Sequence, residues 1–212
     1  MKVKRNINWG VYLVIDPQME REALMNKLTL CLQEPLAAIQ VWDNFENILD
    51  VKALVVDICS LAHSKNIPVL INNRWDLLID SSIDGVHFDT APSEIDFIEK
   101  AVNRPFLKGI TCNNDLSVAE WAEKQEFDYV SFCSIFNSVT SNSCELVSFE
   151  NIKAAKSIFS KLIFLAGGIR PENLVELKGL SFDGVAVVSG IMSSEMPNLA
   201  INRYKENLKN IE

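Results

Sequence analysis

Short apolar runs that are rich in β-branched residues recur along the whole chain. Each run is five or six residues long and shows little alternation between polar and apolar positions. This pattern is typical of strands that are buried on both faces of a parallel sheet. The eight runs cover residues 11–15, 37–41, 68–72, 84–88, 106–111, 128–132, 162–166 and 183–188.

Stretches with apolar residues at helical spacing lie between these runs. Leu24, Leu28 and Leu32 recur every fourth position, so they share one face of a predicted helix. The predicted helices cover residues 21–32, 51–62, 117–124, 149–159, 173–177 and 199–208. The helical pattern is weakest between residues 89 and 105.

Strand and helix alternate about eight times at a pitch of about 26 residues, which is short but sufficient for a βα unit. Eight parallel units favour an α/β fold closed into a single (β/α)8 TIM barrel. An open doubly wound sheet stays the alternative. The sequence shows no linker, charge block or low-complexity tract, so we expect one domain over residues 1–212.

The composition is near the globular average, with 48% apolar and 23% charged residues, and the formal net charge is −8. Nucleic acids and anionic bilayers attract basic surfaces, so this charge argues against both as partners. A phosphorylated small molecule remains compatible, since backbone amides can bind phosphate inside an acidic protein.

The five cysteines are Cys31, Cys59, Cys112, Cys133 and Cys144, and no two of them form a Cys-x-x-Cys pair. This number and spacing argue against a disulfide framework and against a structural zinc site. No run approaches the roughly 18 apolar residues of a membrane-spanning helix. We therefore expect a soluble cytoplasmic protein whose cysteines are reduced packing residues.

Polar residues follow most of the predicted strands, and in a TIM barrel the chemistry lies at these carboxyl ends. They are Asp16, Gln40, Trp42, Asp43, Asn44, Asn72, Asn73, Arg74, Asp76, His87, Asp89, Thr111, Asn113, Asn114, Ser131, Ser134 and Ser189, with a polar loop over 137–143. Arg74 can bind a phosphate through two hydrogen bonds or pair with a nearby aspartate. His87 can face the barrel mouth or be structural, and His63 is expected at a solvated helix end. Trp42 can stack on a flat ring.

Residues 166–173, Ala-Gly-Gly-Ile-Arg-Pro-Glu-Asn, form the most specific local feature. Gly167 and Gly168 let the backbone approach a ligand, and a helix beginning near the proline would direct free amides at the same point. With Val188 and Ser189 after the last strand, this segment predicts the phosphate site that barrels build from their last two loops. The alternative is a tight glycine turn that binds no ligand.

Several segments, taken in order, resemble thiamine phosphate synthase and its relative, the TenI-type thiazole tautomerase. Tyr12-Leu13-Val14-Ile15-Asp16 resembles the family's Tyr-Leu-Val-Thr-Asp, and Asn72-Asn73-Arg74 resembles its Asn-Asp-Arg. The further matching segments are Asp76-Leu77-Leu78, Asp84-Gly85-Val86-His87, Asp128-Tyr129-Val130, Ile135-Phe136, Gly167-Gly168-Ile169, Asn173 and residues 184–189. The resemblance extends from Tyr12 to Ile191.

The resemblance implies an enzyme of thiamine biosynthesis, a transferase that joins hydroxymethylpyrimidine pyrophosphate to thiazole phosphate and releases pyrophosphate. It implies Mg²⁺, because the charge of the leaving group must be neutralised. By position, Arg74 and Thr111 would be catalytic, and Asn73 and Asp89 stand near the family's metal positions. The implied substrate-binding residues are Gln40, Asn72, Asn73, Arg74, Thr111, Thr140, Gly167, Gly168, Val188 and Ser189. The resemblance is also compatible with a homodimer.

The departures from the family pattern are concentrated at the pyrophosphate and metal positions. The replaced positions are Trp42 and Asn44 (Arg and Lys in the family), Asn73 (Asp), Asn113 (His) and Ser141 (Lys). An amide lacks the negative charge that Mg²⁺ prefers in a ligand. Asp89 and Asp43 are then the carboxylates left to recruit a metal from shifted positions.

Three hypotheses for the function stay open. In the first, the chain is a divergent synthase that uses Arg74 with a metal held by Asp89, Asp43 or water. In the second, it is a repurposed relative that binds a thiazole phosphate or thiamine phosphate without synthase activity. The third is another phosphate-binding barrel, such as those of tryptophan or histidine synthesis. Those barrels would need a Lys or an acidic pair at early strand ends, where Asp16 stands alone.

Overall fold

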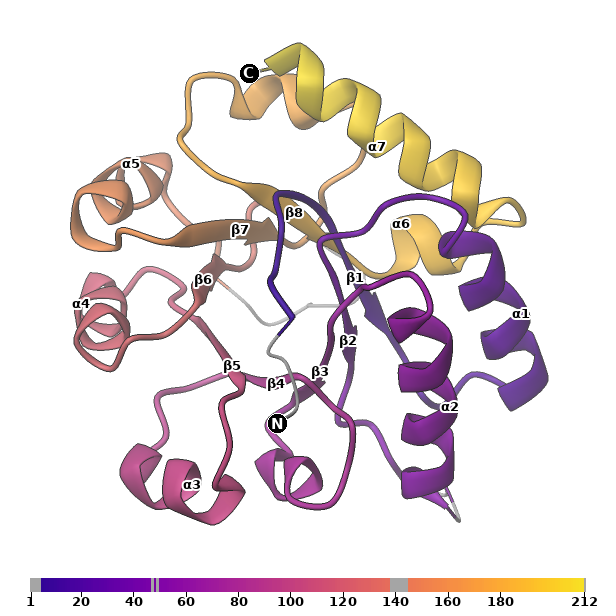
Figure 1. Ribbon diagram of the computed structural model, residues 1–212. Helices are drawn as coiled ribbons and strands as arrows, with labels where there is room; N and C mark the ends of the chain where they lie inside the picture. Colours follow the sequence, from indigo (N-terminus) through magenta and orange to yellow (C-terminus); the bar gives the residue numbers. More distant parts are fainter. Residues whose placement is uncertain (1–4, 47, 49, 138–144, 212) are drawn as a thin grey trace.

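Eight parallel strands close into a barrel in the computed structural model, which describes residues 5–46, 48, 50–137 and 145–211 (Figure 1). The strands are β1 (Gly10–Ile15), β2 (Ala38–Val41), β3 (Val69–Asn72), β4 (Gly85–Phe88), β5 (Leu107–Thr111), β6 (Tyr129–Phe132), β7 (Leu162–Ala166) and β8 (Gly184–Val187). Each strand pairs with the next, and β8 pairs with β1. The predicted (β/α)8 barrel is therefore confirmed, and the open sheet is excluded.

The helices lie outside the ring of strands (Figure 1). They are α1 (Arg21–Cys31), α2 (Val51–His63), α3 (Ile95–Val102), α4 (Leu116–Lys124), α5 (Phe149–Ile158), α6 (Ser189–Met192) and α7 (Pro197–Ile211), with short 3-10 helices η1 (Trp75–Leu78) and η2 (Leu174–Leu177). The weakly patterned segment 89–105 contains α3, which ends where Asn103 adopts a left-handed φ of 49°. Within the described chain, no helix combines the length and hydropathy needed to cross a bilayer.

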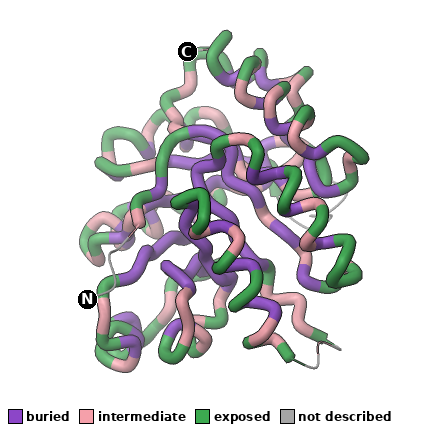
Figure 2. The backbone as a smooth tube through the Cα atoms, turned by 45° about the vertical axis from the view of Figure 1, so that its right-hand side comes forward, coloured by how far each residue is buried: buried purple, intermediate pink, exposed green. Residues whose placement is uncertain are grey.

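Both faces of the strands are buried, which explains why the runs show so little polar alternation (Figure 2). In β1, Leu13 and Ile15 pack into the large cluster formed with the helices. Tyr12, which lies between Val11 and Leu13, belongs instead to the cluster inside the barrel, and Val14, between Leu13 and Ile15, packs against that same cluster. Successive side chains of a strand point to opposite faces, so one apolar run serves both cores.

The barrel interior is filled by a few large side chains that lie opposite small ones. Tyr12, Tyr129 and Phe164 form a ring cluster with centroids 5.4–5.6 Å apart. Gly109 faces the Tyr129 ring, which would overlap any side chain at that position. A glycine in β5 therefore leaves room for a tyrosine from β6.

Three aspartates that precede alternate strands hold the amino-terminal end of the barrel. Each carboxylate accepts a hydrogen bond from a backbone N–H in the preceding strand: Asp84 from Val69, Asp128 from Lys108 and Asp183 from Ile163, each at 2.8 Å. The Asp that begins three of the predicted runs therefore ties neighbouring strands together.

Asp84 is also the centre of a buried polar group. His63 Nε2 lies 2.7 Å from one carboxylate oxygen, and Arg5 Nη1 donates to the other at 2.9 Å. The expectation that His63 is a solvated helix end is wrong, since its side chain is only 15% exposed. The reason is tertiary: α2 ends beside the start of β4.

Four cysteines lie within the described residues, and all four are outside disulfide bonds. Cys31, Cys59 and Cys112 are buried, while Cys133 is partly exposed. Burial raises the pKa of Cys31 and of Cys112 to about 12, so both are protonated packing residues at neutral pH. Cys144 lies outside the described residues.

Candidate functional site

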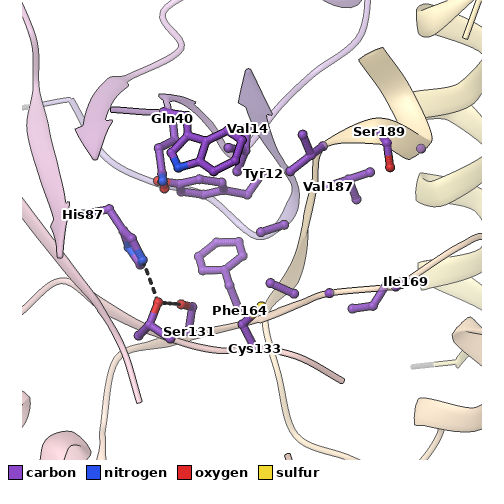
Figure 3. A pocket seen from close by; sticks show the side chains of 18 of the residues that line it. Tyr12, Val14, Gln40, His87, Ser131, Cys133, Phe164, Ile169, Val187 and Ser189 are labelled. Atoms are coloured by element: carbon purple, nitrogen blue, oxygen red, sulfur yellow. Dashed lines mark hydrogen bonds between the residues drawn. The ribbon is translucent and has the colours of Figure 1, made fainter. Parts of the chain in front are cut away.

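A pocket of about 520 Å³ opens at the carboxyl ends of the strands (Figure 3). Eight of the expected site residues line it: Gln40, Asn72, Asp89, Thr111, Gly167, Gly168, Val188 and Ser189. Asn73 and Arg74 are not among the lining residues, and Thr140 lies outside the described residues. Strand ends far apart in the sequence thus converge on one cavity.

A chain of hydrogen bonds crosses the floor of this pocket from one wall to the other. The successive distances are Ser131 Oγ–Thr111 Oγ1 3.1 Å, Thr111 Oγ1–His87 Nε2 2.9 Å, His87 Nδ1–Tyr129 OH 2.9 Å, Tyr129 OH–Tyr12 OH 2.7 Å and Tyr12 OH–Gln40 Oε1 2.9 Å. Figure 3 shows Ser131 and His87 on one side of this floor, and Tyr12 with Gln40 on the other. Sequence reasoning singled out Gln40, Thr111 and His87 but missed both tyrosines.

Counting the available protons assigns one donor-to-acceptor direction to this series of hydrogen bonds. Tyr12 donates its only proton to Gln40 Oε1, so Tyr129 must donate to Tyr12. Tyr129 then accepts from Nδ1–H of His87, which leaves His87 Nε2 to accept from Thr111. Neutral His87 therefore carries its proton on Nδ1, and its basic nitrogen faces the Thr111 hydroxyl.

All groups of this floor are uncharged at neutral pH, and burial favours the neutral form of the three that can titrate, His87, Tyr12 and Tyr129. Burial lowers the pKa of His87 to about 4, although the negative charge of Asp89 acts in the opposite direction. It also raises the pKa values of Tyr12 and Tyr129 well above 10. The floor is thus a neutral hydrogen-bonding surface for a ligand.

The other end of the pocket is a backbone cradle. Gly167 and Gly168 have φ values of 89° and 64°, a region that L side chains rarely adopt. A Cβ on Gly168 would also come within 2.5–2.7 Å of the carbonyl oxygens of Asn137 and Phe136. The Asn173 side chain closes the turn by donating to Gly168 O at 3.0 Å. Glycine is therefore required for packing as well as for any approach of a ligand.

The helix expected to begin near Pro171 begins later, as a 3-10 helix. Residues 171–173 are a turn, and the 3-10 helix η2 begins only at Leu174. Asn173 competes locally, because its Oδ1 accepts from the N–H of Arg170 at 2.8 Å. The cradle is thus made by the glycines and by the residues after β8, without a helix end at Pro171.

The family of this chain is settled by comparison with known proteins. Residues 11–191 match the family model described as thiamine monophosphate synthase. The chain belongs to this family. Its relatives include the thiamine-phosphate synthase of Nitrosococcus oceani, 28% identical over 93% of this chain and 91% of the relative, and that of Methanobrevibacter smithii, 23% identical over 96% and 97%. Thiamine phosphate pyrophosphorylase from Pyrococcus furiosus has a similar structure, with a TM-score of 0.83 at 19% identity over 98% of each chain.

In this thiamine monophosphate synthase family member, Arg74 forms an ion pair with Asp76 at the protein surface. Its Nε and Nη2 donate to the two carboxylate oxygens of Asp76 at 2.9 and 2.7 Å. The side chain is 45% exposed, and its hydrogen bonds lower the pKa of Asp76. A catalytic role of Arg74 stays a prediction that requires it to leave this partner.

The residues at the family's metal position do not fit a divalent cation. Asn73 Nδ2 donates to Asp43 Oδ2 and to Asp89 Oδ2, both at 2.8 Å, and Asn72 Nδ2 donates to Asp89 Oδ1 at 2.9 Å. Amide N–H groups therefore stand where Mg²⁺ requires oxygen ligands. Among the residues that the structure describes, no three His, Cys, Asp or Glu side chains converge as a metal site.

Proposed function

We propose that this chain acts in thiamine biosynthesis and binds a thiazole phosphate or thiamine phosphate in the mouth of its barrel. The observation that carries the proposal is the cradle formed by Gly167, Gly168, Val188 and Ser189 at one end of the pocket. Positive φ values at both glycines expose backbone there, and the Ser189 hydroxyl adds a polar side chain. Backbone amides exposed in this way can bind a phosphate even in a protein of net negative charge.

The rest of the pocket suits a flat ring attached to that phosphate. Trp42, Phe164 and Ile169 supply apolar and aromatic surface, and Trp42 is 36% exposed. The neutral floor offers hydrogen-bonding groups of both kinds, since Gln40 carries donors and acceptors and Ser131 carries a hydroxyl. A ring that is stacked at its face and hydrogen-bonded at its edge matches these surfaces.

Calorimetric titration with thiazole phosphate and with thiamine phosphate tests this proposal. Gly168→Ala should weaken binding at least about tenfold, because the added methyl group and the strained backbone disturb the cradle. Gly179→Ala is the matched control, since Gly179 also has a positive φ of 85° but has open space around it. Absence of binding of both ligands to the wild-type protein at millimolar concentration would refute the proposal.

Condensation is the second candidate function. It is favoured by Gln40, Asn72 and Thr111, which still line the pocket at the positions that the resemblance assigns to the pyrimidine substrate. In this reaction the methylene–oxygen bond of hydroxymethylpyrimidine pyrophosphate breaks, and pyrophosphate leaves with the electron pair. The thiazole nitrogen then forms the new carbon–nitrogen bond.

Product formation from both substrates, with and without added Mg²⁺, separates the two candidates. Turnover that is lost in Arg74→Ala, with thiazole phosphate binding unchanged, would assign condensation to this chain. Binding of thiazole phosphate or thiamine phosphate without any turnover would assign a binding role in the same pathway.

A further inference from the structure

Asn73 sits at the end of β3 in a conformation that is fixed from several sides. Its φ is 54°, and its backbone N–H donates to His87 O at 2.8 Å. Its side-chain Oδ1 accepts from the backbone N–H of Asp89 at 3.0 Å. Its Nδ2 donates to carboxylate oxygens of Asp43 and Asp89. The side chain thus uses its oxygen and both of its N–H groups.

The orientation of this amide follows from its partners. A backbone N–H can only donate, so the side-chain atom facing Asp89 N must be oxygen. A flipped amide would set an N–H against the Asp89 N–H and would turn its oxygen toward two carboxylates. Both contacts would be repulsive, so the N–H groups of Asn73 face the carboxylates.

We infer that the Asn73 amide takes the place of a divalent cation in this barrel mouth. It bridges Asp43 and Asp89, as a cation would, and holds together the loop after β2 and the ends of β3 and β4. Asn72 donates a further hydrogen bond to Asp89, and the nearby Arg74 is committed to Asp76. We call the group Asp43, Asn72, Asn73 and Asp89 the amide clasp. The clasp assembles the mouth without a metal.

Exchanging a single atom of the clasp, Nδ2 of Asn73, for an oxygen would turn it into a set of metal ligands. In Asn73→Asp, an oxygen replaces Nδ2 between Asp43 and Asp89, and three carboxylates converge. Without a cation they repel one another, and with a cation they form an oxygen-ligand set. Asp tolerates a left-handed φ nearly as well as Asn, so the backbone accepts the change.

Titration with Mn²⁺, followed by its electron paramagnetic resonance signal, tests the inference. In metal-free buffer we expect no specific binding by the wild-type protein and no change in its Tm on adding Mn²⁺. Asn73→Asp should have a lower Tm than wild type without metal. It should gain at least about tenfold tighter Mn²⁺ binding, with a Tm rise of roughly 5–10 °C at a hundredfold excess over Kd.

Asn44→Asp is the matched control. Asn44 Nδ2 donates to Asp16 Oδ1 at 3.1 Å, so the variant adds the same charge beside a carboxylate but outside the clasp. It should behave as wild type toward Mn²⁺. This inference goes beyond the proposed function, because none of the measurements needs a ligand or turnover.

Two results would overturn the inference. One is Mn²⁺ binding by the wild-type protein as tight as that of Asn73→Asp and lost in Asp89→Asn. The other is a folded Asn73→Asp protein that gains no binding over wild type. If Asn73→Asp does not fold, the wild-type titration together with Asp89→Asn still decides the question.

Discussion

At the residue scale, the hydroxyl of Tyr12 determines, through Tyr129, which ring nitrogen of His87 carries the proton. Tyr12 donates to Gln40, so Tyr129 has to donate to Tyr12 and accept from His87 Nδ1. The Tyr12 hydroxyl thus selects one tautomer of the neutral His87 imidazole. The consequence for the pocket is a Thr111 hydroxyl whose proton points toward His87.

Tyr12→Phe should remove the constraint on the His87 tautomer. Without the Tyr12 hydroxyl, Tyr129 can donate to His87 Nδ1, and the imidazole can then carry its proton on Nε2. Nitrogen-15 NMR at pH 7 should show the Nδ1–H form in the wild-type protein and a substantial Nε2–H population in the variant. The chain has two histidines, so the His63 signals serve as the internal control.

Two results of this NMR measurement would contradict the prediction. An Nε2–H tautomer of His87 in the wild-type protein would mean that the Gln40 amide is flipped and that the whole hydrogen-bond chain runs in reverse. Unchanged His87 signals in Tyr12→Phe would mean that Tyr12 does not set the tautomer.

Residue-level prediction from the sequence succeeds where one segment acts alone. Gln40, Asn72 and Thr111 lie in the pocket because each is the last or next-to-last residue of an apolar run, and the ends of parallel strands meet. The contact of Tyr12 with Tyr129 joins residues 117 positions apart and depends on the register around a closed barrel. No local pattern carries that information, although an inward-facing tyrosine in an apolar run is a signal worth reading.

At the scale of elements, the repeated aspartates before β4, β6 and β8 are a device that ties pairs of strands. Asp84 is the most buried of them. Burial raises the pKa of its carboxyl, but the hydrogen bonds from His63, from the Val69 N–H and from Arg5 outweigh this, so the pKa falls below its usual 3.8. The charged form therefore stabilises the fold.

Asp84→Asn should reduce the free energy of unfolding by about 2–3 kcal/mol at pH 7, because buried donors lose a charged acceptor. The folded pKa of Asp84 lies below the unfolded one, so its contribution is present above the unfolded pKa. It is lost as the pH falls through the folded pKa, below 3.8. Urea unfolding at pH 7 and at lower pH should show the difference from wild type shrinking with acid.

Asp183→Asn is the matched control for this prediction. Asp183 accepts from the Ile163 N–H in the same way, but its side chain is 27% exposed and its ion pair with Lys156 spans 3.3 Å. We expect a loss of about 1 kcal/mol there. A gap between wild type and Asp84→Asn that stays constant down to acid pH would show that the charge is not the cause.

The elements themselves follow from the sequence with few exceptions. All eight strands lie within the predicted runs or extend one of them by a residue, because strands buried on both faces leave continuous apolar runs. Helix α3 has apolar Ile95, Ile98 and Val102 on one face, but its eight residues give too short a pattern to predict. The helix expected over 173–177 forms as the 3-10 helix η2, and it does not extend back to Pro171 because Asn173 forms a turn there.

At the scale of the whole molecule, the two ends of the barrel carry different tasks. The amino-terminal end is closed by Ile7, which is 9% exposed and packs into the interior cluster, and by the Arg5–Asp84 ion pair. The carboxyl end holds the pocket, the cradle and the amide clasp. Between them lie the packed rings of Tyr12, Tyr129 and Phe164, which fill the interior of the barrel.

This division predicts that stability and ligand binding separate by position along the barrel axis. Ile7→Ala should lower the free energy of unfolding by about 2 kcal/mol and the Tm by roughly 4–8 °C, because it removes buried apolar surface. Its affinity for thiazole phosphate should stay within about twofold of wild type, since the pocket is at the other end.

Ser189→Ala should instead weaken ligand binding about tenfold, because a hydrogen bond to phosphate is lost, and should change the Tm little. Thermal unfolding and calorimetric titration of both variants measure this separation. A loss of affinity in Ile7→Ala as large as that in Ser189→Ala would show that the two ends are coupled through the ring core.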